Sequence, residues 1–336
     1  MAALCYGAGT DRDSGQAEGG RAVRWYISFH GGGDGTAAWN NIHSFGEDGQ
    51  PLGKVLATHA FPHGLELREL RGFAFGPDGD FYIANAYRNA SQVLRFGGQR
   101  GEDGRHPFRE VYVEQHRTNP GLAHPFDVEF GPDGHLYVPS QDTNVVGRYY
   151  GPVSGPDERG APMPHPSALA DAAASLLPGT FVPSLKHHQA GVRTVRRAIF
   201  GPGGTLFVAD RDANRVKRYD GETGALVQEY RHHHLTTPVH LLWHGDGDRL
   251  LVGSRDRNEI LAIAADDGAV TTFVPPGAGG LRGPAGMAFG PDGAFYVCSR
   301  ETKQVLRFDP QSGEPDTRPF LDGLHDFPEF IASVGD

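Results

Sequence analysis

Short apolar stretches alternate with glycine- and proline-rich turns along almost the whole chain. Residues 73–84, Phe-Ala-Phe-Gly-Pro-Asp-Gly-Asp-Phe-Tyr-Ile-Ala, show the pattern: an apolar run, a Gly-Pro-Asp-Gly turn and a second apolar run. Proline fixes φ at one central position of such a turn, and glycine adopts the left-handed conformation that lets two strands pair. The pattern therefore predicts a β-hairpin. It recurs with turns at 131–134, 201–204 and 290–293 and, in degenerate form, at 244–247.

Each hairpin is followed by further segments of strand character, and successive turns lie 43 to 70 residues apart. Third segments occur at 92–96, 146–149, 215–219, 259–263 and 304–308, and less regular fourth segments include 109–113, 226–230 and 270–274. Four short antiparallel strands that recur at this period are typical of the blades of a β-propeller. The predicted fold class is therefore all-β, with four-stranded antiparallel blades.

The two ends of the chain supply the parts of a sixth blade. Segments 24–29, 41–45 and 55–58 read as second, third and fourth strands, but no first strand precedes them. Residues 328–334, Pro-Glu-Phe-Ile-Ala-Ser-Val, match the strand that precedes the turn in the other repeats. We therefore expect a six-bladed β-propeller over 22–336, closed by the C-terminal strand joining the N-terminal blade, which removes the open sheet edges of a linear array.

Two segments depart from the repeat. Residues 1–21 are polar and glycine-rich, and we expect a flexible N-terminal tail there. Residues 152–191 form an insertion, within which 166–177 begin with Pro166, contain strong helix formers and end just before Pro178. We expect a short helix in this insertion, which is either a lid over a site or a decoration without function.

Composition narrows the range of partners. A net charge of −10 disfavours nucleic acid, and no stretch is apolar enough to span a membrane. The two cysteines, Cys5 and Cys298, lie in the tail and in a predicted strand, so a structural disulfide is not expected and a reducing, cytoplasmic location is the default. We expect a monomer or small homo-oligomer that binds a small molecule.

One repeat closely resembles a known propeller family. Residues 206–219, Leu-Phe-Val-Ala-Asp-Arg-Asp-Ala-Asn-Arg-Val-Lys-Arg-Tyr, resemble an NHL repeat. Turn, third strand and closure are similar to those of the wider six-bladed superfamily, which includes gluconolactonase (regucalcin)-like enzymes, virginiamycin B lyase and peptidyl-amidoglycolate lyases. These relatives include hydrolases, lyases and interaction scaffolds, so the resemblance implies the fold but no single activity.

The resemblance also implies the location of a site. In such propellers, the starts of the first strands and the ends of the second strands form a funnel at one face, and small molecules favour such concavities. The first-strand starts are Arg71, Phe126, Arg196, Val239, Ala285 and Glu329, and the next positions are Gly72, Asp127, Arg197, His240, Gly286 and Phe330. The second-strand ends add His30, Asn85, Gln141, Arg211, Arg255 and Arg300.

A divalent cation is one way to use this funnel. The gluconolactonase-like enzymes surround such a cation with a Glu, two Asn and an Asp, the Asn residues in Asn-Gly pairs that open first strands. This chain has Arg71-Gly72 and Ala285-Gly286 at those places, so the ligand set is not matched. Asp127 and Glu329 could still bind one divalent cation, Ca²⁺, Mg²⁺ or Zn²⁺. The same carboxylates could instead form ion pairs with the nearby arginines.

The leading hypothesis is an enzyme of lyase or hydrolase type that acts on an anionic or carbonyl-bearing substrate. It assigns acid/base catalysis to His240, the nearest counterpart of the virginiamycin B lyase base, because histidine exchanges protons near neutral pH. Asp127 or Glu329 would orient His240 or hold a cation. The expected substrate-binding residues are Arg71, Arg196, Arg197, Phe126, His30, Asn85 and His325.

Other interpretations stay open. His240 could equally bond the backbone of a neighbouring blade, and a three-histidine metal site could form from residues that include His30 and His124. Arg211, Arg255 and Arg300 could form a ring for an anionic ligand. The Asp-Arg pair of the NHL consensus, which braces blades, is the favoured explanation of these three arginines. The alternative to an enzyme is a non-catalytic NHL-type scaffold that binds a protein or peptide; it should present a flat face with exposed aromatic anchors rather than a deep polar funnel.

Overall fold

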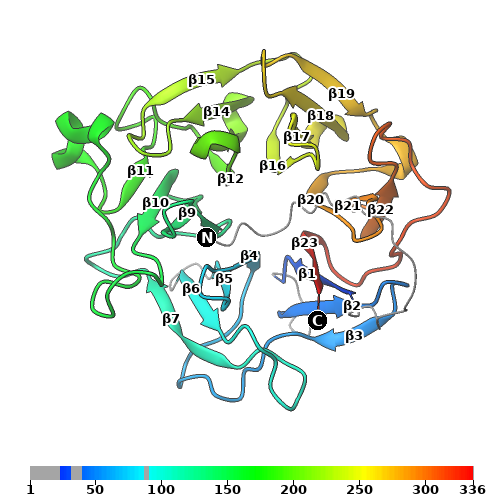
Figure 1. Ribbon diagram of the computed structural model, residues 1–336, viewed down its shortest axis with the longest axis horizontal. Coiled ribbons are helices and arrows are strands. Elements are labelled where there is room, and N and C mark those ends of the chain that lie inside the picture. Colours follow the sequence, from blue (N-terminus) through cyan, green and yellow to red (C-terminus); the bar gives the residue numbers. More distant parts are fainter. Residues whose placement is uncertain (1–22, 32–39, 87–90, 336) are drawn as a thin grey trace, which may run out of the picture.

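The computed structural model describes residues 23–31, 40–86 and 91–335, and the expected tail at 1–21 lies outside this part of the chain. The described strands form six antiparallel sheets arranged around a central axis (Figure 1). Blades 1 to 3, each written from the inner to the outer strand, are β23 (Pro328–Gly335), β1 (Val23–Phe29), β2 (Ile42–Phe45), β3 (Pro51–Lys54); β4 (Leu70–Phe75), β5 (Phe81–Asn85), β6 (Gln92–Phe96), β7 (Phe108–Glu114); and β8 (Glu129–Phe130), β9 (Leu136–Ser140), β10 (Val145–Tyr149), β11 (Thr180–Val182).

Blades 4 to 6 are β12 (Val195–Phe200), β13 (Leu206–Asp210), β14 (Arg215–Tyr219), β15 (Leu226–Tyr230); β16 (Pro238–Trp243), β17 (Arg249–Ser254), β18 (Glu259–Ala264), β19 (Val270–Val274); and β20 (Pro284–Phe289), β21 (Phe295–Ser299), β22 (Gln304–Phe308). Short 3₁₀ segments are η2 (Ser167–Ser175), η3 (Pro202–Gly204), η4 (Arg211–Ala213), η5 (Arg255–Arg257) and η6 (Ala278–Gly280). The predicted all-β, six-bladed propeller is confirmed. No described helix is long and apolar enough to cross a membrane.

The chain closes as its ends predict. β23 pairs antiparallel with β1 from Val23–Gly335 to Phe29–Pro328, so the last strand is the inner strand of blade 1. Each inner strand contacts the inner strands of both neighbouring blades, which completes a ring around the axis. The chain ends are thereby joined in one sheet.

The Gly-Pro-Asp-Gly turns have a second role beyond reversing the chain. The turn aspartate accepts a hydrogen bond from the tyrosine hydroxyl four residues later, at 3.0 Å for Tyr82–Asp78 and 2.9 Å for Tyr296–Asp292. The tyrosine rings pack between blades, so each turn is anchored to a blade interface. The turns lie at the ends of the first strands, opposite to the starts that surround the axis.

The apolar core consists of six clusters, each between two neighbouring blades. Successive side chains of a strand point to opposite faces of its sheet, so each blade contributes to the cluster on either side. In β5, Phe81 and Ile83 face blade 1, whereas Tyr82 and Ala84 face blade 3. A seventh, smaller cluster of Phe126, Val239 and Phe330, with Phe73 against it, lies on the axis.

The fourth strands are the least regular part of the fold. In blade 1 the fourth strand is β3, immediately before the predicted segment 55–58. Blade 6 has three paired strands, and residues 315–321 take the place of the fourth through isolated bridges of Pro315 to Phe308 and Leu321 to Val305. An outer strand has a neighbour on only one side, so its pairing tolerates such variation.

The insertion at 152–191 is built into the rim of the disc. Its residues 180–182 are β11, the fourth strand of blade 3, and the predicted helix is the 3₁₀ segment η2. This segment lies at the outer edge of the molecule (Figure 1), where the Ala168 N–H donates to the Thr223 carbonyl of blade 4 at 3.0 Å. The insertion therefore braces two blades and does not cover the axis in this structure.

Candidate functional site

The six first-strand starts share a local irregularity. The ladder between first and second strand skips two residues in four blades, between Leu70 and Phe73, Val195 and Ala198, Pro238 and Leu241, and Pro284 and Met287. In blade 1, Glu329 is skipped in the same way, and in blade 3 residues 126–128 separate an isolated bridge from β8. A bulge re-aims side chains, and bulges are frequent beside active sites. The skipped residues are the ones that the sequence places around the axis.

In each blade, the residue at the first-strand start and the residue after it form a pair whose members belong to two levels along the axis. The first of each pair lines a pocket of about 340 Å³, which we call the upper pocket; its lining is His30, Glu69, Arg71, His124, Phe126, Gln141, Arg196, Val239, Arg255, Pro284, Ala285, Arg300 and Glu329. The second of each pair lies deeper. A smaller cavity of about 70 Å³, the lower cavity, is lined by Phe73, Arg197, His240, Leu241, Gly286, Met287, Phe330, Ile331 and Ala332.

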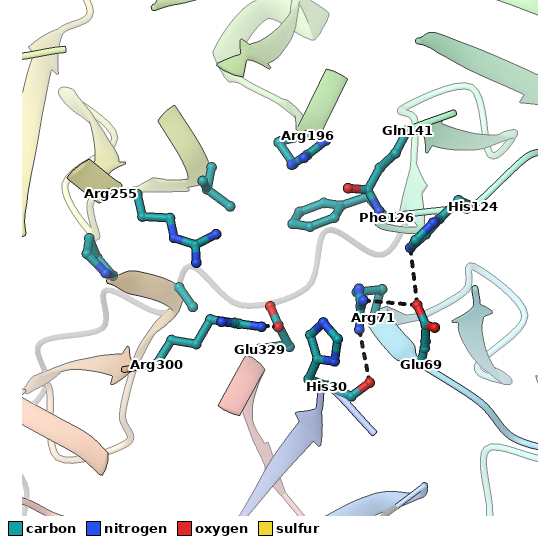
Figure 2. A pocket seen from close by; sticks show the side chains of 13 residues that line it. His30, Glu69, Arg71, His124, Phe126, Gln141, Arg196, Arg255, Arg300 and Glu329 are labelled. Atoms are coloured by element: carbon teal, nitrogen blue, oxygen red, sulfur yellow. Dashed lines mark hydrogen bonds and ion pairs between the residues drawn. The ribbon is translucent and has the colours of Figure 1, made fainter. Parts of the chain in front are cut away.

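One half of the upper pocket carries arginines without carboxylate partners. Arg196 extends from β12 and Arg255 from η5, on the side of blades 4 and 5 (Figure 2). Within the described residues, neither guanidinium forms an ion pair. Arg196 donates to its neighbour's carbonyl, Val195 O, at 2.8 Å and lies 5.6 Å from the ring centroid of Phe126. This half is therefore free to bind an anion.

The other half contains arginines that are already paired. Arg300 Nε donates to Glu329 Oε1 at 2.7 Å, and Arg71 Nη2 lies 3.4 Å from Glu69 Oε2. The same Glu69 oxygen is 3.5 Å from His124 Nε2, so Glu69 joins an arginine and a histidine (Figure 2). Burial would raise the pKa of Glu329, but Arg71 and Arg300 outweigh it and hold that pKa below its usual value. Glu329 is therefore ionised at neutral pH.

Two histidines stand in this paired half. Burial lowers the pKa of both His30 and His124, and the positive charge of Arg71 lowers each further. Both imidazoles are therefore neutral near pH 7 and can accept a proton. The negative charge of Glu329 partly opposes the lowering of the His30 pKa by burial and Arg71, and it would stabilise the protonated form of His30. His124 is already within 3.5 Å of Glu69, whereas His30 projects toward the middle of the pocket (Figure 2), which makes His30 the better placed acid/base group.

The deeper level is a closed polar cluster. Arg197 Nη1 lies 2.9 Å from Asp127 Oδ2, and the Asp127 side chain is 0% exposed. Burial raises the pKa of Asp127 to about 6 and that of Glu129 to about 7, even though Arg197 counteracts both shifts. The ring of His240 packs against the rings of Phe126 and Phe330, and burial and then Arg197 hold the pKa of His240 well below its ordinary value. His240 is thus a neutral, enclosed imidazole.

The aromatic cluster on the axis separates the two levels. Phe126 and Val239 line the upper pocket, Phe330 and Phe73 line the lower cavity, and these four side chains pack together. The two cavities share no lining residue. The hypothesis that Glu329 orients His240 is therefore not supported, because Glu329 lines the upper pocket and His240 lines the lower cavity.

The expected site residues are distributed as follows. Arg71, Phe126, Arg196, Glu329 and His30 meet in the upper pocket, and Arg197, Asp127 and His240 form the deeper cluster. Two expected substrate-binding residues lie elsewhere.

Asn85 is buried and hydrogen-bonded, accepting from Arg68 N at 2.8 Å and donating to Glu66 O at 2.9 Å. Asp210 and Ser254 end their second strands with equivalent bonds to the loop before the first strand, so Asn85 has a structural place. His325 is exposed and does not line the upper pocket.

Several lining residues were not among the predicted ones. Arg255 and Arg300 match the NHL consensus and were attributed to the fold, although Arg255 faces the pocket without a carboxylate partner in the described structure. Glu69 and His124 precede the first strands with positive φ, 49° and 56°. A side chain other than glycine or asparagine in that conformation is uncommon, but φ cannot be read from the chain. The sequence signal that could have identified Glu69 and His124 is their position just before the start of a first strand.

The donor set of the upper pocket does not suit a divalent cation. Its two carboxylates, Glu69 and Glu329, are each paired with an arginine, and four guanidinium groups surround them. Hard cations take six or more oxygen ligands and are repelled by such positive charge. The described residues contain no group of three or more His, Cys, Asp or Glu placed to hold a metal. The chemistry considered below therefore uses no metal.

Comparison with known proteins defines the class of fold. A profile for the WD domain, G-beta repeat matches residues 224–258, a short part of the chain. The search of curated proteins finds no match. The chain is a six-bladed β-propeller, and solved propeller structures of three different kinds resemble it.

One similar structure is the nidogen/laminin complex, at 12% identity and a TM-score of 0.62, covering 93% of this chain and 98% of that one. Another is the periplasmic gluconolactonase of Pseudomonas aeruginosa, at 16% identity and 0.55, covering 94% and 99%. Virginiamycin B lyase from Staphylococcus aureus aligns at 18% identity and 0.48, over 74% and 68%. The neighbours with a TM-score above 0.5 thus include a gluconolactonase and the nidogen/laminin complex, and at these identities the likeness extends to the fold alone.

Proposed function

We propose that this protein is a small-molecule enzyme of hydrolase or lyase type whose anionic substrate binds in the upper pocket. The observation that carries the proposal is the division of that pocket. Arg196 and Arg255 lack carboxylate partners in the described structure, and they face a second half in which His30 lies beside ionised Glu329. The negative group of the substrate binds the two arginines, and its reacting end lies against His30.

The reaction then follows from the state of His30. The neutral imidazole takes a proton either from a water that attacks a carbonyl carbon or from a carbon next to a carbonyl group. In the first case the C–O bond of an ester or lactone breaks. In the second case the bond between the β-carbon and its oxygen leaving group breaks, and a C=C double bond forms. The imidazolium returns its proton to the leaving oxygen. Glu329 stabilises the imidazolium, and Arg71 stabilises the negative charge that develops on the substrate oxygen.

The shape of the molecule favours this proposal over a protein-binding scaffold. A scaffold would present a flat face with aromatic anchors, whereas the axis here opens into a concave, charged pocket. The exposed large apolar side chains of the described residues are Leu52, Val153, Leu185 and Val227, none of them aromatic. Enzymes among the structural neighbours agree with the proposal without deciding it.

The test separates binding from turnover. Arg196→Met and Arg255→Met should each weaken binding of small carboxylates and phosphates about tenfold or more, because a hydrogen bond to a charged group contributes about 1.5–3 kcal/mol. Titration calorimetry measures this. The matched control is Arg231→Met, which removes the same charge from a side chain that is 64% exposed and far from the axis. Unchanged affinity in both pocket variants would overturn the proposal.

Turnover is tested on His30. With a panel of anionic lactones, esters and β-substituted carbonyl compounds, His30→Asn should retain anion binding and lose most turnover. Because the pKa of His30 is lowered, the rate should hold from neutral pH to below about 6.5 and then fall as the imidazole is protonated. Anion binding without turnover of any panel member in the natural protein would favour a non-catalytic binding protein.

A further inference from the structure

The unpaired half of the upper pocket concentrates positive charge. Four arginines line the pocket against two carboxylates, and both carboxylates are occupied by Arg71 and Arg300 in the other half. Two positive charges, on Arg196 and Arg255, are thus left uncompensated at one end. The histidines add none, because their pKa values are lowered.

The surroundings of Arg196 disfavour its positive charge. Burial, together with the neighbouring guanidiniums of Arg211, Arg255 and Arg71, lowers the pKa of Arg196 to about 10. Asp212 is the one carboxylate that acts in the other direction, and it already lies 3.4 Å from Arg211 Nε. Like charges that are held together in a half-buried site repel, and a ligand of opposite charge relieves the repulsion.

We propose that the ligand of the upper pocket is a dianion at one end: a phosphate monoester, or two carboxylates on neighbouring carbons. A single carboxylate would neutralise one guanidinium and leave the second uncompensated. A phosphate monoester carries close to two negative charges at neutral pH and offers three acceptor oxygens, and paired carboxylates offer four. Guanidinium binds both geometries bidentately. This inference rests on the proposed function for the location of the site.

The remainder of such a ligand is constrained by the paired half. In that half Glu69 and Glu329 already neutralise Arg71 and Arg300, so no uncompensated positive charge remains for a second anionic group, and the charge of the ligand belongs at one end only. The opposite end must be uncharged, with polar atoms that suit His30 and Arg71. A small phosphorylated or dicarboxylic compound with a neutral carbonyl end satisfies both halves.

The experiment compares probes that differ in charge and little else. At pH 8 and constant ionic strength, methyl phosphate is compared with dimethyl phosphate, and maleate with its monomethyl ester, by titration calorimetry or protein NMR. We expect the dianion of at least one pair to bind tenfold or more tightly than its monoanion, and the favoured pair identifies the source of the charge. In Arg196→Met and Arg255→Met this preference should fall to within about twofold, whereas Arg231→Met should retain it.

The outcomes distinguish this inference from the proposed function. If monoanions and dianions bind equally well and both lose affinity in the two pocket variants, the dianion inference is wrong and the anion pocket stands. If the preference for dianions is the same in Arg196→Met and Arg255→Met as in the natural protein, the charge is recognised elsewhere and the inference is again wrong. If no probe binds, both proposals are overturned.

Discussion

The buried ion pair between Asp127 and Arg197 gives the sharpest test of whether the two axial levels act separately. Asp127→Asn keeps the shape of the side chain but leaves Arg197 without its carboxylate, 2.9 Å away. Breaking one side of a buried pair costs about 3–5 kcal/mol. For a chain of 336 residues, an unfolding entropy of about 2.1 cal/mol/K per residue converts this into a melting temperature lower by about 4–7 °C.

The paired replacement Asp127→Leu with Arg197→Met should behave differently. It removes both charges together and leaves apolar side chains beside the aromatic cluster, so its melting temperature should lie close to the natural value or above it. Differential scanning calorimetry of the two single variants and the double variant supplies the cycle. Anion binding in the upper pocket should survive in the double variant, because the two cavities share no lining residue.

The pH dependence adds an independent check. The pKa of Asp127 is raised to about 6 in the folded protein, so its contribution to stability is fully present below the ordinary value of 3.8 and is lost as pH rises through about 6. The pKa of His240 is lowered in the folded protein, so its effect on stability has the opposite pH dependence: as pH falls, the histidine of the unfolded chain is protonated first, which destabilises the folded state. Because Arg197 also acts on the pKa of Glu129 and of His240, the comparison that follows Asp127 is the natural protein against Asp127→Asn, which keeps Arg197. The difference in unfolding free energy, natural protein minus Asp127→Asn, should decrease between pH 4 and about pH 7. If Asp127→Asn abolished turnover while leaving stability unchanged, the deeper cluster would be catalytic and the separation argued here would be refuted.

Two predictions concern the frame of the site. Gly72→Ala should lower stability by about 1–3 kcal/mol or more, because its Cβ would meet Asp127 Oδ1 at 1.9 Å, whereas Gly245→Ala, with no atom within 4 Å, should be neutral; equal denaturation midpoints would contradict this. Asn258→Gly should cost about 1 kcal/mol through loss of the 2.7 Å bond from Gly283 N, the left-handed φ being retained; an unchanged urea midpoint would show that this bond does not brace the blades.

The fold could be predicted because the repeat is local. A Gly-Pro-Asp-Gly turn needs only four residues to define a hairpin, and five visible copies fix the period and leave the first strand of blade 1 to be found at the C-terminus. The outer strands resisted prediction for the converse reason. β3 and β11 are short, pair on one side only and carry little pattern, so 55–58 was chosen in place of 51–54.

For the candidate site, the sequence predicts which residues lie around the axis but not which of the two cavities each of them lines. Counting back from the turn placed Arg71 and Glu329 on the axis, because the first strands are alike up to their bulge. That two adjacent residues enter different cavities depends on the aromatic cluster between them, which forms from blades far apart in the sequence. The pairing of Arg300 with Glu329, and the lack of a carboxylate partner for Arg255 in the described chain, likewise depend on contacts between blades.

The pairing of β23 with β1 has a consequence for folding during synthesis on the ribosome. His30 follows the first described strand and Glu329 belongs to the last, yet both line one pocket, and the His30 N–H donates to Phe327 O at 3.0 Å. During synthesis the N-terminal residues emerge long before their partners exist. A ribosome-bound chain that still lacks β23 therefore exposes an unpaired β1 edge and possesses no complete pocket. The pocket to which the proposed function assigns the ligand is complete only after the last described strand has left the ribosome and entered blade 1.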